Sequence, residues 1–127
     1  MKKSKMELIN DFFKVLEIAP GELGFSATLQ LNPDHFVYTG HFPGYPVTPG
    51  VIQLQIVQEL LENHLDKNLR LSTLQNCKFL KILNPTETLQ LVVHIELKRI
   101  DNELTIKARG ENQAAIFFKL NAAYQFI

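Results

Sequence analysis

The chain of 127 residues contains only one cysteine, Cys77, so it cannot form a disulfide within itself. This usage suits a reducing compartment, and we expect the protein to be cytoplasmic. The charges balance, with 13 Lys and Arg against 13 Asp and Glu, which argues against a general nucleic-acid-binding protein. No apolar run approaches the roughly 20 residues of a membrane-spanning helix. We therefore expect a soluble protein without a membrane span.

Motifs for metals and phosphate groups are also missing. The four histidines lack the spacing of metal ligands, and no Gly-rich P-loop or Rossmann motif is present. We expect neither a metal nor any other cofactor. Cys77 has no basic cluster beside it, so we interpret it as a small apolar side chain rather than a nucleophile. The length and an apolar content of 46% fit a single domain that spans residues 1–127.

Alternation of apolar and polar residues predicts six strands, and a period of about 100° per residue predicts one long helix, Val51 to Asp66. The polar residues of this helix fall on one arc, which we expect to be exposed: Gln55, Gln58, Glu59 and Glu62. Turn signals stand at Pro20-Gly21, Asn84-Pro85, Asp101-Asn102 and Gly110. The predicted strands are 12–18, 25–31, 74–83, 89–98, 104–109 and 114–126.

The order of the predicted elements is therefore two strands, one helix and four strands. A single helix cannot cover both faces of a large sheet, so a curved antiparallel sheet wrapped round the helix is the simplest α+β arrangement. Such a sheet leaves an edge or a face uncovered, which favours a dimer or a higher oligomer.

Proline and glycine are scarce but concentrated. The chain has six of each, and three of each fall within the segment Thr39–Gln55, TGHFPGYPVTPGVIQLQ. This segment resembles the GHFPG-x-P-x-x-PGV motif of the FabA/FabZ-type 3-hydroxyacyl-[acyl-carrier-protein] dehydratases. The similarity extends upstream through FKVLEIAPGELGFSATLQLN and downstream through CKFLKILNPTETLQL, so it covers most of the chain. It implies the hotdog fold, in which an antiparallel sheet wraps a long central helix.

The resemblance also implies a catalytic site. Loss of water from a 3-hydroxyacyl thioester needs a base for the C2 proton, donors for the charge on the thioester oxygen, and an acid for the departing hydroxyl. His41 matches the catalytic histidine, whose ordinary pKa suits a base near neutrality. The amide of Gly50, at the start of the helix, would polarise the thioester. Phe42, Pro49 and Val51 would contribute to substrate binding.

One position departs from the family pattern. The family has a Glu or Asp five residues after the glycine that matches Gly50, and this chain has Gln55 there. Glutamine is not a practical general acid, and loss of the acid typically costs about two to four powers of ten in rate. Glu59, one turn further along, could act through a water while Gln55 orients the hydroxyl. Alternatively, the substrate needs no strong acid, the protein binds acyl groups without chemistry, or a partner chain supplies the acid.

The remaining candidates have weaker support. Lys78 and Lys81 flank Phe79 and would form a positive rim for an acidic acyl carrier protein. We expect His94 on a solvated face and His64 near the helix end, and we assign no role to His35.

The sequence thus predicts a dehydratase-like enzyme that acts on thioesters linked to acyl carrier protein and forms trans-2-enoyl thioesters, in the synthesis of fatty acids or of related lipids or polyketides. The alternatives are a hotdog thioesterase and a non-catalytic acyl-binding subunit that completes a heterodimer with a related hotdog chain.

Overall fold

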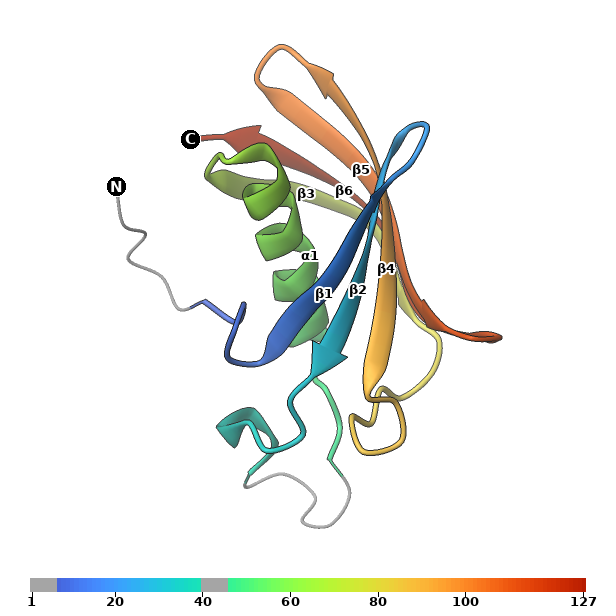
Figure 1. Cartoon of the computed structure of the whole chain (residues 1–127). Coiled ribbons are helices and arrows are strands. Elements are labelled where there is room, and N and C mark those ends of the chain that lie inside the picture. Colours follow the sequence, from blue (N-terminus) through green and yellow to red (C-terminus); the bar gives the residue numbers. More distant parts are fainter. Residues whose placement is uncertain (1–6, 40–45) are drawn as a thin grey trace.

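The computed structural model describes residues 7–39 and 46–127 of the chain. Within these residues, two strands are followed by one long helix and four further strands, as predicted (Figure 1). The elements are β1 (Phe13–Pro20), β2 (Gly24–Leu31), the short 3-10 helix η1 (Phe36–Tyr38), α1 (Gly50–Leu65), β3 (Leu69–Phe79), β4 (Gln90–Ile100), β5 (Glu103–Asn112) and β6 (Ala115–Phe126).

The six strands form one antiparallel sheet in the order β1-β2-β4-β5-β6-β3. The sheet curves round α1, which lies on its concave side (Figure 1). The inward side chains of the strands and the buried arc of α1 form one hydrophobic core; Phe13, Leu29, Val93, Phe118 and Ile56 are all at most 1% exposed. The expected α+β arrangement is confirmed. Among the described residues, no helix has both the length and the apolar character needed to cross a bilayer.

Helix α1 begins and ends at residues that suit those positions. Pro49 is its N-cap in an extended conformation, and no acidic residue lies in its first turn. Proline and glycine at this point favour an abrupt change from an extended loop to a helix. At the other end, Asp66 adopts a left-handed conformation with φ 53°, and its N–H donates to the carbonyl of Glu62. This closes the helix one residue before the predicted boundary.

The prediction that Glu59 and Glu62 lie on an exposed arc of α1 is wrong. Glu59 and Glu62 are each only 3% exposed. Glu59 accepts hydrogen bonds from the backbone N–H groups of Leu8 and Ile9, and Glu62 accepts one from Leu69. Segments on either side of the helix therefore cover it, and each carboxylate satisfies backbone donors that burial would otherwise leave without a partner.

Two details of the sheet also differ from the prediction. Strand β3 runs from Leu69 to Phe79 rather than over 74–83. It is an edge strand and mostly exposed, so its burial does not alternate and the sequence pattern did not indicate its bounds. Gly110 does not form a turn but lies within β5, where the ring of Phe118 occupies the space of a β-carbon. The turn comes later, at Gln113, whose φ is 53°.

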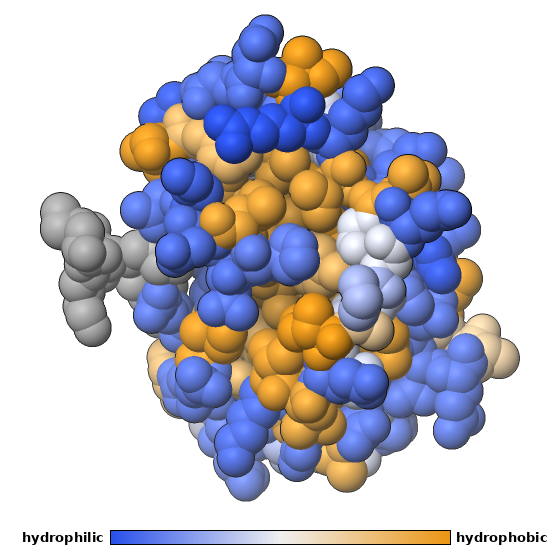
Figure 2. Space-filling view, turned by 45° about the horizontal axis from the view of Figure 1, so that its top comes forward, coloured by the Kyte–Doolittle hydropathy of each residue, from blue (hydrophilic) through white to orange (hydrophobic). Residues whose placement is uncertain are grey.

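Part of the surface is apolar. Figure 2 shows hydrophobic residues gathered over the middle of one face, with hydrophilic residues round them. Large apolar side chains on β3 and directly after it are at least a third exposed: Leu71, Leu74, Phe79, Leu80 and Ile82. A long edge strand with exposed apolar residues is a ready template for pairing with another chain.

Candidate functional site

The segment that precedes α1 is held together at its two ends. The hydroxyl of Tyr38 lies 2.7 Å from the hydroxyl of Thr48, and the N–H of Thr48 donates to the carbonyl of Leu83. Burial raises the pKa of Tyr38 to about 12, although the bond to Thr48 acts in the opposite direction. The predicted catalytic residue His41 and the predicted substrate-binding residue Phe42 belong to this segment, and both lie outside the described residues.

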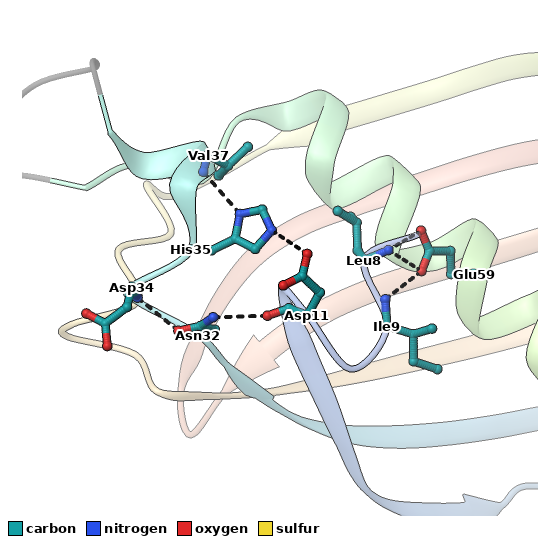
Figure 3. A network of polar contacts seen from close by, with 8 residues as sticks. All are labelled: Leu8, Ile9, Asp11, Asn32, Asp34, His35, Val37 and Glu59. Carbon is teal, nitrogen blue, oxygen red and sulfur yellow. Dashed lines mark hydrogen bonds and ion pairs between the residues drawn. The ribbon is translucent and has the colours of Figure 1, made fainter. Parts of the chain in front are cut away.

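A buried histidine orients the chain that leads into this segment. His35 is 3% exposed, and its Nδ1 accepts a hydrogen bond from the N–H of Val37 (Figure 3). Because Nδ1 is the acceptor, Nε2 carries the proton and donates to the carboxylate of Asp11 at 3.1 Å. His35 is thus a structural residue that fixes η1 to the segment before β1.

Gly50 is needed where it stands because an aromatic ring lies against it. A β-carbon at Gly50 would come within 2.7 Å of two atoms of the Phe79 ring. The first N–H groups of a helix have no partner within the helix, and the helix dipole makes this end positive. An acyl oxygen that reaches the Gly50 amide therefore approaches beside the Phe79 ring.

A cleft of about 360 Å³ opens at this end of α1. Residues 47–50 and Gln53 form one wall, and residues 79–83 form the other. Pro49 and Gly50, predicted to bind substrate, line the cleft, and so does Lys81. Val51 is 71% exposed and is not part of the lining, and Lys78 is an exposed residue of β3. The cleft is mainly apolar, with a positive helix end and one cation.

The structure brings Gln55 and Glu59 into direct contact. The amide Nε2 of Gln55 donates to Glu59 Oε2 at 2.8 Å. Both carboxylate oxygens of Glu59 also accept from the N–H of Leu8, and Oε1 accepts from Ile9 as well (Figure 3). Neither Gln55 nor Glu59 is among the described residues that line the cleft. Within one chain, Glu59 anchors the amino-terminal segment, and Gln55 braces it.

Sequence reasoning missed Gln53. Its side chain is 3% exposed, its Nε2 donates to the carbonyl of Thr48, and no described residue donates to its Oε1. The helical spacing contained a signal, because Gln53 precedes Ile56, Val57 and Leu60 by three, four and seven residues. Those three are at most 1% exposed, so a glutamine on their arc is a polar residue at an inward position.

His94 does not line this cleft, and it lies on the outer face of the sheet, since its neighbours Val93 and Ile95 are buried. Its Nδ1 is 2.7 Å from the hydroxyl of Ser26, and its Nε2 is 3.2 Å from Glu111, so it is hydrogen-bonded rather than simply solvated as expected. The hydrogen bond from Arg109 is the main reason that the pKa of Glu111 is lowered. A hollow of about 470 Å³ lies beside these residues.

The hotdog fold, the cleft at the start of its helix and the motif that leads into it define a dehydratase-like protein of the FabZ type. The chain belongs to the ApeI-like family, described as ApeI dehydratase, whose profile matches residues 18–118. The resemblance seen in the sequence is thereby confirmed. Within residues 7–39 and 46–127, no group of three or more His, Cys, Asp or Glu is placed to hold a metal ion.

Similar proteins agree with this assignment. The FabZ 3-hydroxyacyl-[acyl-carrier-protein] dehydratase of Rickettsia bellii is 29% identical over 112 residues, which cover 80% of this chain and 77% of the relative. The FabZ of Lactobacillus helveticus is 30% identical over 105 residues, covering 77% and 70%.

Solved structures share the fold. The dehydratase heterocomplex ApeI:P from Xenorhabdus doucetiae contains a chain that superposes with a TM-score of 0.71 at 21% identity, covering 88% of this chain and 96% of that one. A candidate thioesterase from Silicibacter gives a TM-score of 0.61 at 15% identity, covering 92% and 80%. The thioesterase likeness concerns the fold alone, so it supports the thioesterase alternative only weakly.

Proposed function

We propose that this chain removes water from 3-hydroxyacyl thioesters linked to acyl carrier protein and forms trans-2-enoyl thioesters, in the synthesis of fatty acids or related lipids or polyketides. The observation that carries the proposal is the cleft at the start of α1, where Gly50 lies in a first turn that contains no acidic residue. The FabZ relatives act on substrates of this class by their description. The expected compartment is the cytoplasm, for which the single cysteine is the support.

The proposed chemistry divides the work among few groups. His41 takes a proton from C2, and the negative charge moves onto the thioester oxygen. The Gly50 N–H and the helix dipole stabilise this charge. The C3–O bond then breaks, and the departing hydroxyl must gain a proton to leave as water. The carboxamide of Gln55 can donate a hydrogen bond to this hydroxyl but cannot transfer a proton to it at neutral pH.

In a site built from this chain alone, no acid is assigned that would supply this proton. Glu59, whose carboxylate contacts Gln55, already accepts from two backbone N–H groups and from Gln55. A water-mediated role for Glu59 would require it to serve the hydroxyl as well. We therefore propose that full activity depends on a second hotdog chain that contributes an acid, and the heterocomplex of the ApeI:P neighbour supports this arrangement.

The edge strand β3 is the surface that we propose for pairing, with another copy of this chain or with a related chain. Leu71, Leu74 and Phe79 are exposed along this strand, and Phe79 at its end also lines the cleft. Sedimentation of the purified protein should show a dimer, and Leu74→Asp should shift it to the monomer. Leu16→Asp, on the opposite edge strand β1 and similarly exposed, is the matched control and should leave the dimer intact. Equal effects of the two substitutions would contradict pairing through β3.

One measurement separates the candidate functions. The protein is incubated with a 3-hydroxyacyl thioester of acyl carrier protein, and the mass of the product is measured by mass spectrometry. Loss of one water identifies a dehydratase, whereas release of the free acid identifies a thioesterase. No change, with retained binding, indicates the non-catalytic subunit, and the assay is then repeated with an added chain of the same family that has the acid.

A further inference from the structure

The amide of Gln53 is oriented by the structure itself. Its Nε2 donates to the carbonyl of Thr48 at 3.1 Å, and the flipped orientation would turn oxygen toward oxygen. Its Oε1 therefore points away from Thr48, and among the described residues it finds no donor although the side chain is 97% buried. A buried acceptor without a partner is uncommon, and a bound ligand or an ordered water would satisfy it.

Gln53 is one of the residues that line the cleft, so a bound substrate is one source of such a donor. Gln53 lies on the cleft at the start of α1, at its buried wall, whereas Leu80 and Ile82 on the opposite wall are each 53% exposed. Lys81, also exposed, belongs to the same outer rim. A substrate on a carrier would thus keep its carrier arm toward the rim and place its acyl part toward Gln53.

We propose that Gln53 binds the 3-hydroxyl of the acyl substrate, with Oε1 accepting the hydrogen bond that the hydroxyl donates. This inference rests on the proposed function, because it assumes a 3-hydroxyacyl thioester with its carbonyl at the Gly50 amide. Gln53 follows Gly50 by three residues, so it lies on the same side of the helix, about 4.5 Å further along its axis. The carbonyl and hydroxyl oxygens of a 3-hydroxyacyl group sit on carbons separated by a single methylene, which fits this spacing.

The other donors on such a substrate are the two amide N–H groups and the hydroxyl of the pantetheine arm, all on the far side of the sulfur. These groups lie toward the rim when the acyl part lies inward, and so away from the buried Gln53. The 3-hydroxyl is the donor that fits the depth of the site. Gln53 supplies no proton; it holds the hydroxyl, and thereby discriminates hydroxylated from saturated acyl groups.

The test combines a change in the protein with a change in the ligand. The ligands are 3-hydroxybutyryl-pantetheine and butyryl-pantetheine, prepared as amides in place of thioesters so that neither reacts during titration. The proteins are the unchanged chain, Gln53→Met and the control Gln58→Met. Gln58 also lies on α1 and donates its amide to a backbone carbonyl, that of Leu69, but it does not line the cleft.

The unchanged chain and Gln58→Met should bind the hydroxylated ligand about tenfold more tightly than the saturated one, as one additional hydrogen bond allows. Gln53→Met should remove this preference and leave the affinity for the saturated ligand similar. A preference that survives in Gln53→Met overturns the proposal, and so does an equal loss of affinity for both ligands. Loss of the dimer in Gln53→Met would likewise overturn it, because the donor would then belong to the partner chain. If the unchanged chain binds neither ligand, the proposed thioester site itself is wrong, whatever the role of Gln53.

Discussion

Replacing Gln55 by glutamate places an acid at the family position and tests why the chain lacks one. In the structure, the Gln55 amide donates to Glu59 Oε2 at 2.8 Å, and Glu59 is only 3% exposed. Two ionised carboxylates at that distance would repel each other by about 6 kcal/mol at an effective dielectric constant of about 20. The introduced carboxyl should therefore keep its proton and donate it to Glu59 as an O–H···O bond. This neighbour raises the pKa of the introduced carboxyl.

In a dimer that brings position 55 of the partner chain to the cleft, the protonated carboxyl can supply the proton that the departing hydroxyl needs. We expect Gln55→Glu to turn over a 3-hydroxyacyl thioester at least ten times faster than the unchanged protein, a barrier change of about 1.4 kcal/mol, and His41→Ala to be inactive. Gln58→Glu adds the same charge to the same helix and should not increase the rate. An unchanged protein that is already fast and is slowed by Gln55→Glu would refute this reasoning, because the carboxamide would then have a positive role. If the unchanged protein, Gln55→Glu and His41→Ala are all inert until a related chain is added, the acid comes from the partner.

The pH dependence of stability provides a second readout. A carboxyl whose pKa is raised in the folded state favours folding at pH values below its ordinary pKa, about 4.3. That contribution is lost as the pH rises through the raised value. The thermal midpoint of Gln55→Glu, relative to the unchanged protein, should therefore fall as the pH rises above about 4.3. A constant difference across this range would mean that the introduced carboxyl and Glu59 are not coupled.

Three further substitutions test the surroundings of the site. Tyr38→Phe removes the bond to Thr48; it should cost about 1 kcal/mol in the free energy of unfolding and lower kcat, since the base of the His41 segment loosens, and an unchanged kcat would speak against a positioning role. Glu59→Ala leaves two backbone N–H groups without their acceptor and should lower that free energy by about 2 kcal/mol or more; an unaltered denaturation midpoint would contradict the anchoring role. Arg109→Met removes the main cause of the lowered pKa of Glu111, whose contribution to stability is present above its ordinary pKa and lost as the pH falls; acid titrations of stability should show a weaker decline in the variant than in the unchanged protein.

Local sequence patterns were enough to predict the order of the elements and the location of the helix. Alternation of period two fits a pleated strand with one buried face, as in β2 and β4, and Pro49-Gly50 marks the start of α1 within one residue. These signals are local because they depend on backbone preferences and on which face is apolar. Strand β3 lacked a clear signal, since an exposed edge strand imposes no alternation of burial.

Residue types at short, fixed spacings were sufficient to predict the fold class, the dehydratase-like motif and the replacement of the family acid by Gln55. Three features became evident only in the folded chain: Glu59 anchors Leu8 and Ile9, Phe79 packs on Gly50, and Gln53 is a buried acceptor without a described donor. Burial and hydrogen-bond partners depend on segments that lie far apart in the chain, so local patterns do not predict them. The contact between Leu8 and Glu59 spans 51 positions, and no periodicity along one helix can indicate which distant segment will cover it.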